Sequence, residues 1–94
     1  MRCGGLSVGH GPTAEDIAVL HGVRAEINRQ FGRSVSRLEA LSVATQVVAG
    51  LNYFFKARVD DEVAHLRIFR SLQGTLQLVA VQRPKTLTDP LDYF

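Results

Sequence analysis

The side chains best suited to chemistry are one thiol and three imidazoles, Cys3, His10, His21 and His65. A catalytic thiol needs a base held against it, and a metal ion needs clustered ligands. Cys3 lies in a glycine-rich stretch that cannot hold a base, and the histidines fall on an arm, a helix and a strand at spacings that match no metal motif. We therefore predict no catalytic residue, metal or cofactor, no enzyme activity, and ordinary surface or boundary positions for the histidines.

Residues 46–50 read Gln-Val-Val-Ala-Gly, an apolar run where a turn between two strands ordinarily has polar residues. Two interpretations are open: the end of a buried strand closed by a glycine turn, or an exposed apolar tip that binds a partner. A second reversal at 71–74, Ser-Leu-Gln-Gly, holds Leu72 in a similar place. Because alternate turns of a meandering sheet lie at the same end, we expect the two tips, with the glycine-rich arm, to form one wedge-shaped edge.

The elements that position these tips begin with an arm and a helix. Residues 1–12 contain four glycines and a proline without periodicity, which predicts a flexible arm. Thr13 and Asp16 resemble a capping box, and Gly32 is a natural left-handed stop, so one helix is expected between them. Gly22 inside it costs roughly 1 kcal/mol against alanine or lets a strand approach closely. The apolar helix positions recur every three or four residues and predict one buried stripe: Ile17, Leu20, Val23, Ile27 and Phe31.

After Gly32 the apolar period changes to two, which is typical of half-buried strands. A change of phase near Ala40 indicates a β-bulge, residues 51–59 form the clearest strand, and Asp60-Asp61 is a turn candidate. Strands are also expected around 64–68 and 76–80, and the apolar end of the tail (Leu91, Tyr93, Phe94) is expected to pack. The prediction is an α+β fold, with one N-terminal α-helix packed across a four- to five-stranded antiparallel β-sheet.

Composition limits the class of protein further. A chain of 94 residues accommodates one domain, taken as 1–94. The net charge is +2 and the nine arginines are dispersed, which disfavours nucleic-acid binding. No run reaches the ~20 apolar residues that span a bilayer, and the N-terminus lacks the apolar run of a signal peptide. One cysteine permits no internal disulfide, so we expect a reducing, cytoplasmic location.

These motifs resemble the stefins, the type 1 (cystatin A/B-like) members of the cystatin family. The run at 46–50 is similar to the glutamine-x-valine-x-glycine signature, and segments 52–54 (Asn-Tyr-Phe), 65–69 (His-Leu-Arg-Ile-Phe) and 71–72 (Ser-Leu) resemble stefins in particular. The resemblance covers nearly the whole chain. It implies a reversible, tight-binding, competitive inhibitor of papain-like cysteine proteases, whose arm and two hairpins occlude the active-site cleft. It implies these protease-binding residues: Gly4, Gly5, Gln46, Val47, Val48, Ala49, Gly50, Ser71, Leu72 and Gln73.

The implied partners are cathepsins L, S, H and B and papain, with no nucleic acid and no membrane. A monomer is expected, with a domain-swapped dimer through 47–49 or a Cys3-linked dimer as alternatives. A non-inhibitory cystatin-fold interaction module or engineered binding scaffold is the alternative function.

Two departures from the stefin pattern bear on potency. Gln73-Gly74 replaces a proline and predicts a more flexible second loop, and Leu51 replaces a polar residue and predicts a more apolar tip.

Overall fold

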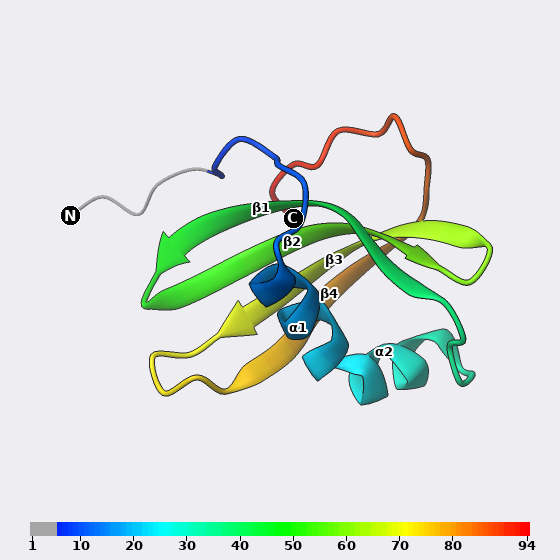
Figure 1. The fold of residues 1–94 in the computed structure, drawn as a ribbon, viewed down its shortest axis with the longest axis horizontal. Helices are drawn as coiled ribbons and strands as arrows, with labels where there is room; N and C mark the ends of the chain where they lie inside the picture. Colours follow the sequence, from blue (N-terminus) through cyan, green and yellow to red (C-terminus); the bar gives the residue numbers. More distant parts are fainter. Residues whose placement is uncertain (1–5) are drawn as a thin grey trace.

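The computed structural model of the chain describes residues 6–94 (Figure 1). Residues 1–5, which include Cys3, Gly4 and Gly5, lie outside the described residues. The four strands form one antiparallel sheet in the order β1-β2-β3-β4, which confirms the predicted α+β class and meandering sheet. The elements in chain order are α1 (Ala14–Gly22), α2 (Arg24–Phe31), β1 (Leu38–Val48), β2 (Gly50–Val59), β3 (Glu62–Arg70) and β4 (Leu76–Lys85).

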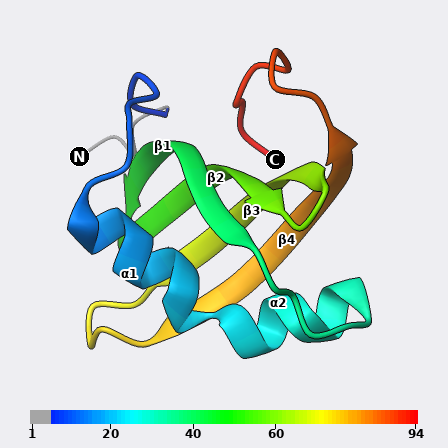
Figure 2. The ribbon, with the colours of Figure 1, turned by 45° about the vertical axis from the view of Figure 1, so that its right-hand side comes forward.

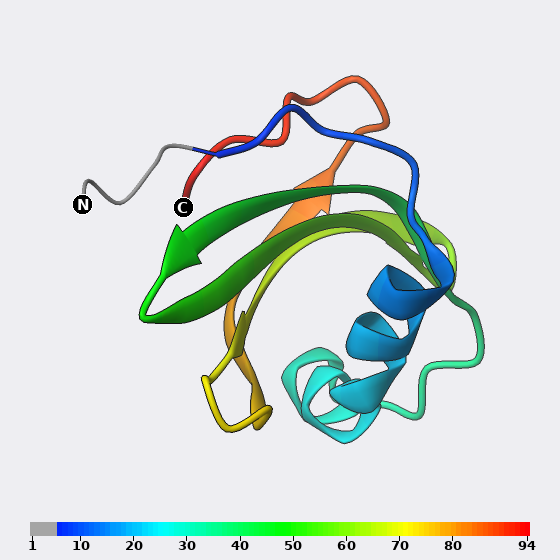
Figure 3. The same ribbon diagram turned by 60° about the vertical axis from the view of Figure 1, so that its left-hand side comes forward.

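The predicted single helix is two helices, because the backbone leaves helical geometry at Val23, where φ is −112° and ψ is 22°. The glycine and the β-branched valine at 22 and 23 are both weak helix formers. The predicted capping box at Thr13 and Asp16 is confirmed, as is the left-handed stop at Gly32. The break allows the two helices to follow the curved sheet, so that α1 contacts β1 and α2 contacts β4 (Figures 2 and 3).

The helices cover the concave face of the sheet, and their buried stripe differs from the prediction at one end. Ile17 is 42% exposed, whereas Asp16 and Val19 are buried. A Cβ on Gly22 would lie 2.7 Å from Cδ1 of Leu76, so this glycine does allow β4 to approach. The core between helices and sheet contains Val19, Leu20, Val23, Ile27, Phe31, Val35, Leu38, Val43, Tyr53, Phe55, Ala57, Val59, Ala64, Leu66 and Ile68.

The strand register follows the predicted alternation. The phase change near Ala40 is a β-bulge, since Ala40 pairs with Ala57 and Ser42 with Lys56, leaving Leu41 without a partner across the strands. Further irregularities between β3 and β4 bend the sheet. The turn at Asp60-Asp61 is also confirmed. Asp60, at φ 55°, accepts hydrogen bonds from the backbone N–H groups of Ser36 and Arg37.

The convex face of the sheet is covered by the C-terminal tail, and here one prediction is wrong. His65 is buried, with 1% of its surface exposed, rather than at the boundary. The ring of Phe94 lies 6.5 Å from it, and the rings of Tyr93 and Phe94 lie 5.7 and 5.6 Å from that of Phe54. The tail therefore packs as predicted. It buries the convex face of β2 and β3, which the alternating apolar pattern of these strands had assigned to solvent.

The burial of His65 makes stability dependent on pH. Burial first, and then the charges of Lys85 and Lys56, lower the pKa of His65, although Asp89 and Asp92 oppose this. In the unfolded chain the imidazole binds a proton near pH 6.5, whereas in the folded chain it does so only at lower pH. Stability is therefore complete above about pH 6.5 and falls as the pH drops from there toward the lowered pKa.

We predict that the free energy of unfolding, measured by urea denaturation at pH 7.5 and pH 5, falls less in His65→Leu than in the parent chain. The carboxylates of Asp60 and Asp89 do not interfere. Their pKa values are lowered by hydrogen bonds from the Arg37 and Thr86 backbone respectively, so their stabilisation is lost only below about pH 4. Equal losses in the two proteins would contradict the assignment to His65.

Candidate functional site

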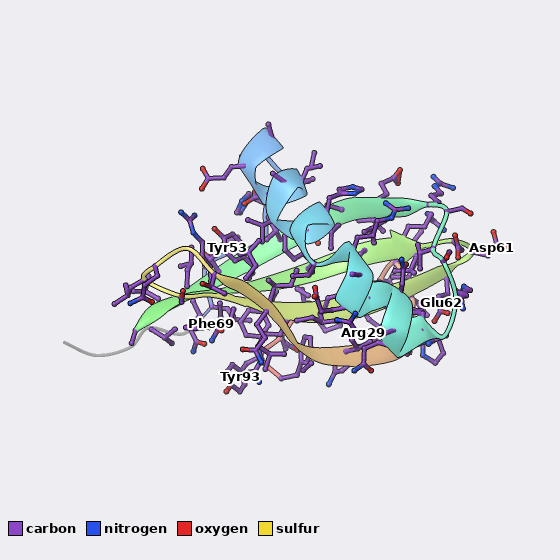
Figure 4. All side chains as sticks on the ribbon, turned by 90° about the horizontal axis from the view of Figure 1, so that it is seen from below. Arg29, Tyr53, Asp61, Glu62, Phe69 and Tyr93 are labelled. Carbon is purple, nitrogen blue, oxygen red and sulfur yellow. The ribbon has the colours of Figure 1, made fainter. Side chains whose placement is uncertain are left out.

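The two apolar turns lie at the same end of the sheet, which we call the hairpin edge (residues 46–50 and 71–75). The first turn joins β1 to β2 and the second joins β3 to β4, so the antiparallel order brings them to one end (Figures 1 and 3). The turn at Asp60-Asp61 lies at the opposite end, beside Glu62 (Figure 4). This placement agrees with the expectation from turn counting.

The first hairpin has an exposed apolar tip, which contradicts the interpretation of these residues as a buried strand end. Val47 is 52% exposed and Ala49 is exposed, while Gln46, Val48 and Gly50 are half-buried. The tip stands on a polar brace, since Nδ2 of Asn52 donates to Oε1 of Gln46 across the strands at 3.0 Å. Apolar side chains are thus presented on a paired hairpin rather than buried as a strand end.

Gly50 is required by the geometry of this tip for two reasons. Its φ of 126° lies in the region that favours glycine. In addition, a Cβ there would lie 2.4 Å from the carbonyl oxygen of Arg70 and 2.8 Å from two ring atoms of Phe69. Any other residue would have to displace β3, so the glycine lets the first hairpin lie directly against the strand that leads into the second.

The second hairpin presents a highly exposed apolar side chain. Leu72 is 79% exposed, and Gln73 beside it is also exposed. Ser71 closes the loop with three hydrogen bonds, because its N–H donates to Thr75 O, its carbonyl accepts from Gly74 N, and its hydroxyl accepts from Thr75 N, at 2.9, 2.9 and 3.0 Å. These bonds tie together the loop that was expected to be more flexible in the absence of proline.

The described part of the arm runs antiparallel to β1. The backbone of His10 exchanges two hydrogen bonds with Val43, both at 2.9 Å, and the N–H of Ser7 donates to Thr45 O at 2.8 Å. Nε2 of His10 also lies 3.4 Å from the buried carboxylate of Asp16, which caps α1. Toward its start, therefore, the arm advances along β1 in the direction of the first hairpin. Gly4 and Gly5 lie outside the described residues.

Between the two hairpins is a shallow hollow of about 270 Å³ lined by Gly50, Leu51, Arg70, Ser71 and Leu72. Nη1 of Arg70 lies 3.5 Å from the hydroxyl of Tyr53 and 3.2 Å from Oε1 of Glu15. The Tyr53 hydroxyl first, and then Glu15, raise the pKa of Arg70 above its ordinary value.

Leu51 is half-buried and packs against the core, so it adds less exposed apolar surface to the tip than expected.

Sequence reasoning missed the residues that support the tips. Asn52, Phe69 and Arg70 contact the first hairpin, and Ser7 and His10 fasten the arm. The strand period could have placed Asn52 opposite Gln46, but the approach of Phe69 to Gly50 depends on the bend of the sheet. No local sequence pattern predicts this contact.

The rest of the described chain offers little chemistry. Residues 6–94 contain no group of three or more His, Cys, Asp or Glu side chains arranged to hold a metal ion. In the same range no helix is long and apolar enough to cross a membrane. A hollow of about 600 Å³ lies at the far end of the sheet, where Asp60 and Glu62 form ion pairs with Arg33, and Glu62 also with Arg83. These charged groups form ion pairs beside the turn at Asp60-Asp61, at the end of the sheet opposite the hairpin edge.

Comparison with known proteins shows the family of the chain. Residues 13–80 match the family model described as the cystatin domain. Cystatin-A2 of Dictyostelium discoideum is 39% identical over 95 residues, which cover 99% of this chain and 98% of its own. Cystatin-B of Homo sapiens is 38% identical and cystatin-B of Bos taurus 36% identical, each with full coverage of both chains. The chain therefore belongs to the cystatin family, stefin-like in type, whose members inhibit cysteine proteases and are not enzymes, as the resemblance implied.

Proposed function

We propose that this chain is a reversible, competitive inhibitor of papain-like cysteine proteases that inserts its hairpin edge into the active-site cleft. The observation that supports this most directly is the convergence of two exposed apolar tips, at Val47 and Leu72, at one end of the sheet. Single apolar side chains on a surface are ordinary, but two on adjacent hairpins with a hollow between them suit a concave partner.

The binding free energy in this proposal comes from desolvating the tips. The apolar side chains of 47–49 and Leu72 leave water, and the hairpins behind them are already paired, so few groups must be ordered on binding. Gln46, Gly50, Ser71 and Gln73 hold the shape of the edge or contact its rim. The partners proposed are cathepsins L, S, H and B and papain.

The arm is proposed to act as a clasp once the hairpins have docked. The antiparallel bonds of Ser7 and His10 to β1 support this role because they aim the arm along the strand toward the first hairpin. Gly4 and Gly5 have no side chains, so their backbone suits a close approach to the wall of the cleft.

The proposed inhibitor resists turnover because its contacts are hairpins. A protease cleaves an extended peptide whose carbonyl is presented to the thiolate. Here the backbone at both tips is held in turns, by the Asn52–Gln46 pair in one and by the Ser71 bonds in the other.

We also propose one domain over 1–94, a monomer as the inhibitory form, and a cytoplasmic location, which suits a single thiol.

The first experiment is titration of active-site-counted papain with the purified chain, followed with a fluorogenic substrate. Competitive inhibition with the chain uncleaved afterwards is expected. No inhibition at micromolar concentration by a folded monomer would overturn the proposal and favour a non-inhibitory interaction module.

We predict that Val48→Asp raises the inhibition constant at least about 30-fold, because an unpaired charge in a desolvated contact costs at least ~2 kcal/mol. Val79→Asp is the matched control. Val79 is 43% exposed on β4 outside the hairpin edge, and its substitution should leave the inhibition constant unchanged. Equal effects of the two substitutions would contradict the placement of the binding surface.

Deletion of residues 1–5 should raise the dissociation rate constant several-fold and leave the association rate constant nearly unchanged, because a clasp acts after docking. Surface plasmon resonance with catalytically inactivated papain measures both. Thermal unfolding serves as the control, since the described bonds of the arm begin at Ser7 and should survive the deletion. Identical dissociation rates would count against the clasp.

A further inference from the structure

One aromatic ring joins the two hairpins. Cε1 and Cζ of Phe69 lie where a side chain at Gly50 would be, 2.8 Å from the position of its Cβ. Phe69 is the second-last residue of β3, and Ser71, two positions later, closes the second loop. The ring thus touches the tip of the first hairpin at Gly50, while its own strand leads into the second hairpin. Figure 4 shows Phe69 at the hairpin end of the sheet.

The register explains how the ring reaches the tip. Phe69 pairs with Asn52 rather than with Gly50, so its side chain must lean along the strand to contact the glycine. Asn52 is also the residue whose amide braces Gln46. Val48 pairs with Gly50 and therefore lies on the same face of the sheet as Phe69. The ring and the amide pair together support the face of the first hairpin that bears Val48.

We propose that Phe69 is a positioning residue that holds the first hairpin at a fixed place relative to the second. This inference rests on the proposed function, because the separation of the tips matters only to a partner that binds both. A smaller side chain leaves a void beside Gly50 and lets the first hairpin tilt. The tips must then be ordered when they bind, and that cost appears as weaker inhibition.

The test uses Phe69→Leu, with Phe54→Leu as a control on the same face. Phe69 is half-buried, so its replacement should lower the thermal midpoint only slightly and raise the inhibition constant for papain about three- to tenfold. Phe54 is fully buried beneath Tyr93 and Phe94, and its pair with Arg67 lies two residues further from the first hairpin than the pair of Asn52 with Phe69. Its replacement should lower the midpoint more and leave inhibition unchanged. This contrast separates positioning from general support of the fold.

A double-mutant cycle with Val48→Ala separates positioning from direct contact. If Phe69 acts by placing Val48, then Phe69→Leu should weaken inhibition less in the Val48→Ala background than in the parent chain. Additive losses, or a Phe69→Leu protein that inhibits as the parent does, would overturn the inference and leave the proposed function standing. A parent chain that does not inhibit papain would overturn the proposed function, and this inference with it.

Discussion

The structure depends on the burial of one face of β2 and β3 beneath the two helices. Phe55 and Leu66, which pair across these strands, are fully buried in the same core as Ile27. A slip of one residue in the pairing would turn these side chains away from the helices to the opposite face of the sheet, so the core determines the register of the sheet. The register in turn determines which residues reach the turns. The exposed apolar tips are thus a consequence of the same alternation that builds the core.

The two ends of the sheet are built differently. At the far end, Asp60 joins the turn to backbone N–H groups and to Arg33, so side-chain charge holds the chain in place. At the hairpin edge the support is backbone pairing, amide and hydroxyl hydrogen bonds, and the contact of Phe69 with Gly50. Supports of this kind leave apolar side chains free at the surface, although the ion pair of Arg70 with Glu15 lies beside the hollow between the hairpins. An edge of that composition suits a partner whose cleft excludes water.

The burial of the convex face could not be predicted from the periodicity of the strands. The alternation in β2 placed Tyr53 and Phe55 inward and left Phe54 facing outward, as if toward solvent. The tail returns over that face and buries Phe54 and His65, so both faces of the central strands are covered. Residues 91–94 suggested by their apolar character that the tail packs. That character does not predict which face the tail covers, because a contact between segments far apart in the chain leaves no periodic pattern in either.

The sequence alone determined the class of fold, the order of strands, the bulge near Ala40 and the grouping of two apolar turns at one end, because each follows from local periodicity and from the geometry of a meander. Only the tertiary structure decided the break at Val23, the burial of His65 and the approach of Phe69 to Gly50. Gly22 and Val23 are weak helix formers, but a break there, like the other two features, also depends on the curvature of the sheet and on what packs against each face. Curvature arises from bulges and twist summed over four strands, and no single segment of the chain encodes that sum.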